Sequence, residues 1–388
     1  MILTNGKIYT MESEPIPNGF VIFDKKIIKT GDMAELTDEM KSGHDIIDAD
    51  GGYVFPGFID AHTHLGMFED SLGFEGDDGN EESEPVTPQL RAVDAVNPTD
   101  GYFKEARNAG ITCVSTGPGS ANPISGSFLV MKTAGDIIDD MIVKDPSAIK
   151  FSFGENPKTV YRSKERQPST RMATAALIRE QLQKASDYLT ELSDYQKDKD
   201  EYDKPEYDIK CESLIPLLKR DIPMKAHAHR ADDIMTAVRI AKEFNLKLTI
   251  EHATEGHLIA DRLKRENIPC NIGPTLSDRS KPELKNMTFE IYGILEKKGI
   301  DVSIITDHPE TPIAFLPLCA ALAVKYGMSE YGALKAITVN PAKALGVFDR
   351  VGSLKCGKDA DITVFDRFPL DIYARAKYVF VNGVKING

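Results

Sequence analysis

Strand-like and helix-like segments alternate through most of this 388-residue chain. Eight apolar stretches have the length and composition of buried strands, and segments with apolar residues at helical spacing separate most of them. This alternation over residues 55–345 predicts an α/β fold, a (β/α)8 TIM barrel. The expected strands are YVFPGFIDAH (53–62), GITCVSTG (110–117), GSFLVMKT (126–133), AIKFSFGE (148–155), IPMKAHAH (222–229), LKLTIEHA (246–253), IPCNIGP (268–274) and DVSIITDH (301–308).

The two chain ends differ from the middle and resemble each other. Residues 1–54 contain ILTNGKIYTM and FVIFDKKIIKTG, and residues 346–388 contain ADITVFD and AKYVFVNGVKING. These stretches are rich in β-branched and aromatic residues, with Asn-Gly turns between strand-like pieces. We therefore predict that both ends pair into one small, discontinuous β-sandwich domain, with the barrel inserted between them.

Charge and apolar content exclude several classes of partner. The net charge of −13 argues against nucleic acid, because a phosphate backbone needs a basic surface. No apolar run approaches about 18 residues, so we expect no membrane span, and the N-terminal segment lacks the pattern of a signal peptide. The five cysteines are scattered and form no C-x-x-C pair, which indicates reduced thiols in a cytoplasmic protein.

Histidines gather at the ends of the expected strands. Chemistry in (β/α)8 barrels takes place at the carboxyl ends of the strands. His62 and His64 are two residues apart, so alternation along a strand points them the same way, together with Asp60. Other strand ends supply His227 and His229, His252, and Asp307 with His308.

This set of side chains predicts a metal site built from several strands. Imidazole mixed with carboxylate suits zinc, and also iron, manganese or cobalt. A catalytic site keeps one position for water, whose acidity the metal raises toward neutrality. Asp307 beside that water could take its proton and pass it to a leaving nitrogen. We expect one or two divalent ions, with zinc as the first choice.

The order of these residues resembles that of the amidohydrolase superfamily. FPGFIDAHTHLG (55–66) is similar to the signature around the first ligands, ALKAITVNPAKALG (333–346) to the last helix, and GSLKCGKDADITVFD (352–366) to the returning β segment. The stretches AHAH, IEHAT and GENPKTVY are most similar to the imidazolonepropionase-related or Xaa-Pro dipeptidase-like branch. The resemblance covers essentially the whole chain.

The resemblance implies a role for each strand-end residue. His62 and His64 would bind a buried metal, and Asp307 would contact it and act as general base and acid. His227 and His252 would bind a second metal, or complete a single site.

The ligand on the fourth strand has two candidates in IKFSFGENP. Two-metal members of the superfamily use either a carboxylated lysine or a glutamate at this point, and the chain offers Lys150 and Glu155. We favour Glu155, because it lies closer to the expected strand end and needs no modification. The two residues are an odd number apart, so a regular strand cannot point both inward.

Other residues are candidates for substrate binding. His229 either contacts substrate or supports a ligand through a hydrogen bond, and Arg230 and Tyr161 are candidates for a substrate carboxylate. His308 would point away from Asp307 and belongs to the structure or the rim. The acidic, Gly- and Pro-rich residues 69–88 form either a solvated loop or a lid over the barrel mouth.

These observations predict a metal-dependent amidohydrolase that cleaves a C–N bond in an amide, a cyclic amide or a dipeptide by attack of metal-activated water. A ring deaminase is the alternative within the superfamily, but deaminases have a His-x-x-Glu that the stretch HAHRAD lacks. A non-catalytic barrel scaffold is the other alternative, which the full ligand set disfavours. We expect a small-molecule substrate and allow for a homo-oligomer.

Overall fold

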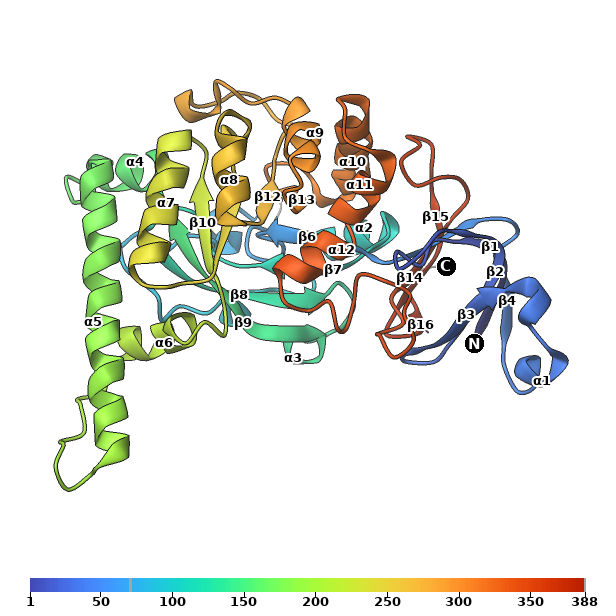
Figure 1. Ribbon diagram of the computed structural model, residues 1–388, viewed down its shortest axis with the longest axis horizontal. Coiled ribbons are helices and arrows are strands. Elements are labelled where there is room, and N and C mark those ends of the chain that lie inside the picture. The colour runs from blue at the N-terminus through green and yellow to red at the C-terminus, as the bar shows by residue number, and fades with distance from the viewer. Residues whose placement is uncertain (70–71, 387–388) are drawn as a thin grey trace.

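The computed structural model describes residues 1–69 and 72–386 (Figure 1). One of its sheets has eight strands that follow one another in chain order. All eight expected strands are present, so the predicted barrel is confirmed. They are β6 (Phe58–Thr63), β7 (Ile111–Thr116), β8 (Ile124–Lys132), β9 (Ile142–Ser152), β10 (Met224–Ala228), β11 (Leu248–His252), β12 (Cys270–Ile272) and β13 (Val302–Ile304).

Backbone hydrogen bonds join the two ends of this sheet. The amide of Asp307 donates to the carbonyl of His62 at 3.2 Å, and the amide of His64 donates to the carbonyl of His308 at 2.9 Å. Both bonds connect the end of β6 to the segment that follows β13. The barrel is therefore closed at the carboxyl ends of these two strands, and the first and last candidate ligands are brought side by side.

One strand departs from the parallel arrangement expected of a (β/α)8 barrel. β8 runs antiparallel to both β7 and β9, while the other neighbouring pairs from β6 to β13 are parallel. The connections before and after β8 are residues 117–123 and 133–141. A parallel return needs a crossover of a dozen or more residues, so these short connections reverse the chain.

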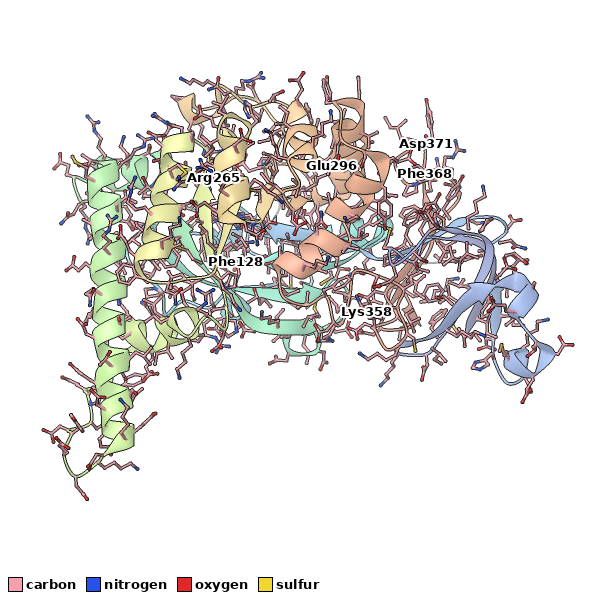
Figure 2. All side chains as sticks on the ribbon, viewed as in Figure 1. Phe128, Arg265, Glu296, Lys358, Phe368 and Asp371 are labelled. Atoms are coloured by element: carbon pink, nitrogen blue, oxygen red, sulfur yellow. The ribbon has the colours of Figure 1, made fainter. Side chains whose placement is uncertain are left out.

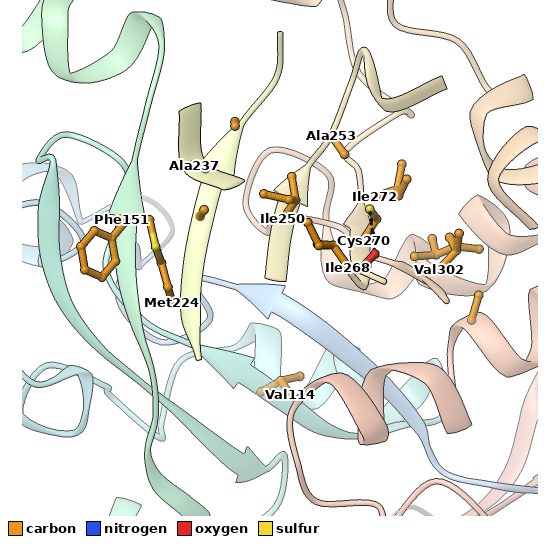
Figure 3. Close-up of a cluster of buried hydrophobic side chains, with 14 of the residues drawn as sticks. Val114, Phe151, Met224, Ala237, Ile250, Ala253, Ile268, Cys270, Ile272 and Val302 are labelled. Carbon is orange, nitrogen blue, oxygen red and sulfur yellow. Dashed lines mark hydrogen bonds between the residues drawn. The ribbon is translucent and has the colours of Figure 1, made fainter. Parts of the chain in front are cut away.

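Alternation along the strands separates an apolar outer layer from a polar interior. Figure 3 shows Phe151, Met224, Ile250, Ile272 and Val302 from neighbouring strands in one apolar cluster, with Ala237 from a covering helix. Lys150, Lys225 and Glu251 are the sequence neighbours of the first three, are also buried, and contact one another or His62. Barrel interiors are usually filled by branched apolar residues, so this interior is built for polar chemistry.

Helices cover the outside of the barrel (Figure 1). The longest one, α5 (Arg171–Lys197), begins at Thr170, whose side chain accepts a hydrogen bond from the amide of Ala173. No helix of the described residues combines the length and the apolar character that a membrane span needs. The other helices around the barrel are α2 (Tyr102–Asn108), α3 (Ile138–Met141), α4 (Glu155–Ser163), α6 (Ile209–Leu218), α7 (Ala231–Glu243), α8 (Ala260–Glu266), α9 (Glu290–Lys297), α10 (Leu316–Lys325), α11 (Glu330–Ala336) and α12 (Val339–Ala344).

The chain ends form a second eight-stranded sheet, as predicted. β5 pairs antiparallel with β14, which joins the N-terminal strands to the C-terminal ones, and the short helix α1 (Asp38–Lys41) lies beside the sheet. The boundaries at residues 54 and 346 stay predictions. The strands are β1 (Ile2–Ile8), β2 (Ile16–Phe23), β3 (Ile27–Asp32), β4 (Ile46–Asp48), β5 (Tyr53–Pro56), β14 (Ile362–Phe365), β15 (Ala376–Val381) and β16 (Val384–Lys385).

Aromatic rings and a buried ion pair attach this sheet to the barrel. Phe365 of the chain-end sheet stacks on Phe58 of the barrel with 5.3 Å between ring centroids, while Phe368, labelled in Figure 2, packs edge-on against Tyr53 of its own sheet at 5.7 Å. The ammonium of Lys132 on β8 lies 2.6 Å from the carboxylate of Asp361. The contacts of the sheet are therefore with β6 and β8, in the amino-terminal half of the barrel.

Candidate metal centre

An inner group of three side chains forms where the barrel closes: His62, His64 and Asp307. Oδ1 of Asp307 lies 3.4 Å from Nε2 of His62 and 3.3 Å from Nε2 of His64. Each of the three residues offers a ligand atom within 4.8 Å of those of the other two. Alternation along β6 points both imidazoles to the same side, as predicted, and the closing hydrogen bonds bring Asp307 to them.

An outer group of three histidines lies next to the inner group: His227, His229 and His252. Their ligand atoms also lie within 4.8 Å of one another. The rings of His227 and His252 are 4.3 Å apart, and His62 of the inner group is 5.4 Å from His252, measured between centroids. The parallel pairing of β10 with β11 sets this arrangement, because Ala228 lies opposite His252.

Two ligand candidates adopt a left-handed backbone conformation at the end of a strand. His252 has a φ of 71° and Asp307 a φ of 53°. Such values are uncommon outside glycine and cluster at functional sites. At His252 the conformation breaks the alternation of β11, so that Glu251 and His252 both reach the site although they are neighbours in sequence.

Backbone carbonyls orient two of the imidazoles. Nδ1 of His64 donates to the carbonyl of Gly117 at 2.6 Å, and Nδ1 of His252 donates to the carbonyl of Gly273 at 2.7 Å. A carbonyl only accepts, so the proton is on Nδ1 and the lone pair is on Nε2. Nε2 of His252 is buried and has no hydrogen-bond partner among the described residues. This donor set fits a divalent cation.

Burial keeps the imidazoles of His62 and His252 neutral, as metal ligation requires. Burial lowers the pKa of His62 to about 4, with the charges of Lys150 and Lys225 acting in the same direction. Burial also lowers the pKa of His252 to about 3, against the opposing effect of Asp307. Both rings therefore present a lone pair at neutral pH.

The structure places Lys150 against the inner group and Glu155 apart from it. Lys150 is on β9, and its ammonium donates to Nε2 of His62 at 3.0 Å. β9 ends at Ser152, and Gly154, with a φ of 84°, directly precedes α4, so Glu155 is the first residue of that helix. Neither ligand group in the described residues includes Glu155. The preference for Glu155 assumed a strand that continues to residue 155, whereas β9 ends at Ser152.

Lys150 also has the protonation behaviour that a carboxylated lysine needs. Burial lowers its pKa to about 7, although Asp307 and Glu251 oppose the shift. An amine must be neutral to react with carbon dioxide, and a lysine of this pKa is partly neutral at physiological pH. Lys150 is therefore the better candidate for the fourth-strand ligand.

The two candidates for a substrate carboxylate do not reach the cavity above the metal centre. Tyr161 on α4 is fully buried, and its hydroxyl donates to Oδ1 of Asn122. Arg230 precedes α7 and pairs with Asp232 at 2.8 Å on the surface. Neither residue lines the cavity described below. His308 is held in the structure, because its Nδ1 accepts from the amide of Ile313 at 3.3 Å.

A cavity of about 820 Å³ opens directly above the two groups. Asn80 and Glu82 of the acidic loop lie in its wall, while residues 70–71 of that loop fall outside the described part of the chain. His229 lines the cavity as well, and its Nδ1 is 2.7 Å from the hydroxyl of Thr254. Other lining residues are His64, Lys150, Glu155, Asn156, His227, Lys281, Asp307 and Glu310.

Sequence reasoning missed two kinds of site residue. Asn156 donates to Oγ of Ser120 at 2.6 Å, and its side-chain oxygen accepts from Lys281 at 2.9 Å. Asn156 and Lys281 were missed because neither of them is a strand-end histidine or carboxylate. Glu251, a fully buried carboxylate 3.0 Å from Nδ1 of His62, could have been suspected, because IEHAT places an acidic residue inside an apolar strand.

Comparisons with known proteins agree with this architecture. The model of the amidohydrolase family matches residues 213–387. The crystal structure of an amidohydrolase from Thermotoga maritima MSB8 is 41% identical and superposes with a TM-score of 0.95, covering 100% of this chain and 99% of that one.

Two curated relatives are similar over nearly the whole chain. Amidohydrolase tasK of Hapsidospora irregularis is 29% identical over 98% of this chain, which spans only 42% of that protein. The imidazolonepropionase of Picrophilus torridus is 26% identical over 100% of this chain and 98% of its own length.

Enzymes with this fold carry their active sites at the carboxyl ends of the barrel strands, and this barrel places imidazole and carboxylate groups there. Together with the similarity to the Thermotoga maritima protein, this arrangement identifies the family of the chain. The chain belongs to the amidohydrolase superfamily, a class of hydrolases that act on C–N bonds.

Proposed function

We propose that this protein is a metal-dependent amidohydrolase that cleaves the C–N bond of an amide, a cyclic amide or a dipeptide. The observation that supports it most is the meeting of the inner and outer groups beneath one cavity of about 820 Å³. A cavity of that size takes a small molecule. The cytoplasmic location and a homo-oligomer stay predictions.

The inner and outer groups would hold one or two divalent cations, with zinc as the first choice and iron, manganese or cobalt as alternatives. His62, His64 and Asp307 would hold the first, and His227 and His252 the second, with His229 turned to the substrate. We assign the fourth-strand position to a carboxylated Lys150 in place of Glu155. A bound cation supplies a Lewis acid that polarises the scissile carbonyl and acidifies a water molecule.

Asp307 moves the proton in this scheme. Its Oδ1 is buried without a hydrogen-bond donor among the described residues, so it is available to accept one. The carboxylate takes a proton from the attacking water, holds it on the same side chain, and donates it to the nitrogen as the C–N bond breaks.

The test combines metal analysis with a substrate panel. We expect about one to two equivalents of divalent metal per purified chain, and hydrolysis of members of a panel of N-acyl amino acids, dipeptides and cyclic ureides. His62→Ala should lose the inner metal and the activity. Full metal occupancy in this variant, or undiminished hydrolysis after chelation, would contradict the proposal. Release of ammonia from a ring substrate without ring opening would instead support the deaminase alternative.

A further inference from the structure

A charged side chain lies buried beneath the inner group and has no part in the scheme above. Glu251 on β11 has no exposed surface. Its Oε2 lies 2.9 Å from the ammonium of Lys225 on β10, and its Oε1 accepts from the hydroxyl of Thr249 at 2.7 Å. The side-chain amide of Asn271 on β12 donates to both oxygens, at 3.0 and 3.1 Å.

This network is expensive to build, which indicates a use for it. Burying a charge costs several kcal/mol unless the charge is paired and hydrogen-bonded. Lys225 is also buried, and it donates a further hydrogen bond to the carbonyl of Ala61 on β6 at 2.8 Å. Polar groups of four different strands therefore hold one carboxylate in place. Well-packed apolar side chains could fill the same volume at no such cost.

The carboxylate is directed at the one inner imidazole that no carbonyl orients. Oε2 of Glu251 lies within ion-pair distance of Nδ1 of His62, at 3.0 Å, and that buried nitrogen makes no hydrogen bond among the described residues. On the opposite edge of the ring, Nε2 of His62 accepts from Lys150 at 3.0 Å and faces Asp307 at 3.4 Å. The contacts with Glu251 and Lys150 favour the same tautomer, with the proton on Nδ1 and the lone pair on Nε2, while the carboxylate of Asp307 opposes it from the longer distance of 3.4 Å.

We propose that Glu251, held by Lys225, is a positioning residue that fixes the tautomer and the orientation of His62 and so presents Nε2 to the inner cation. A carboxylate on the outer nitrogen of a ligating imidazole also raises its basicity. The role in cation binding rests on the proposed function, whereas the control of the tautomer does not. Gly117 and Gly273 serve His64 and His252 with neutral carbonyls, so His62 alone among these three has a charged support.

The experiment compares Glu251→Gln with a matched control. The substitution keeps the shape but removes the charge. In the metal-free protein, ¹⁵N NMR of the His62 ring should change from the Nδ1–H tautomer to a mixture. Competition titration with zinc should show inner-site affinity about 10–100-fold lower. Asp233→Asn removes another buried carboxylate, which pairs with Arg171 outside both groups; it should leave both measurements unchanged.

Unequal charge in the barrel could by itself unfold the first variant, because Lys225 would lose its partner. The double variant Lys225→Met, Glu251→Gln removes both charges, should fold, and should show the same mixed tautomer. An unchanged tautomer in either folded variant overturns the positioning role. If the tautomer changes but the wild-type protein binds no zinc, the positioning role stands and the metal-dependent function is what fails.

Discussion

The inner and outer groups offer the same number of ligands but are built differently. The inner group contains a carboxylate, Asp307, and its His62 has a second carboxylate, Glu251, behind it. The outer group consists of three imidazoles supported by a carbonyl and a hydroxyl. Both sit at the same end of one barrel and are largely buried, so the main difference lies in charge.

Charge should make the inner group the stronger binding site. A dication gains more Coulomb energy from a donor set that contains a carboxylate than from neutral imidazoles, and the gain is larger in a buried site. Burial holds the pKa of His227 in the outer group well below its ordinary value. The positive charge of the nearby Lys281 acts in the same direction. We therefore expect the inner cation to be retained longer than the outer one on dialysis against a chelator.

Among substitutions that leave the histidines of both groups in place, the largest effect is expected at Asp307. Asp307→Asn keeps the shape but cannot accept a proton, so kcat should fall about 10²–10⁴-fold. Steady-state kinetics on the best substrate of the panel measures this. The matched change in the outer group, His229→Gln, should alter KM more than kcat. Equal losses of kcat in both variants would remove the distinction between the groups.

Protonation of His62 in the inner group and of His252 in the outer group should lower the free energy of unfolding of the metal-free protein. The ordinary histidine pKa of about 6.5 falls to about 4 for His62 and about 3 for His252 in the folded chain. Between these values the unfolded chain binds more protons, so stability is complete above about pH 6.5 and is lost as the pH falls, by about 1.4 kcal/mol per unit for each histidine.

Urea unfolding of the metal-free protein from pH 7 to 4.5 tests this dependence. His62→Gln and His252→Gln should each flatten the slope by one histidine's share. His44→Gln, an exposed position in the chain-end part of the sequence, serves as the control and should leave the slope as it is. A wild-type stability that does not fall between pH 6.5 and 4.5 would contradict neutral, buried imidazoles.

The smallest effect expected separates the supports of the two groups. Thr254→Val removes the hydroxyl that contacts His229, the imidazole turned to the substrate, and the loss of about 1 kcal/mol should raise KM about fivefold. Thr249→Val removes a hydrogen bond from Glu251 and should weaken the inner cation by a similar factor. Steady-state kinetics measures the first effect, and zinc competition titrations of both variants measure the second. The comparison fails if either substitution acts on the opposite site.

Much of the fold followed from residue patterns. Apolar stretches of strand length located all eight barrel strands, and the matching composition of the chain ends predicted their shared sheet. The reversed direction of β8 was missed, because a pattern of apolar residues does not show in which direction a strand runs. The short connection at residues 117–123 was the available signal. The choice between Lys150 and Glu155 depended on where β9 ends, and the structure ends it at Ser152.

The linear sequence determined which side chains could serve: imidazoles and a carboxylate at the ends of strands, where a barrel gathers them. The period of two along each strand is a local property, and it was enough to group His62 with His64. Tertiary structure alone decided which distant groups touch them. Glu251 and Lys150 both lie against His62, because strand pairing and barrel closure set those distances, and neither of these is a local property of the chain.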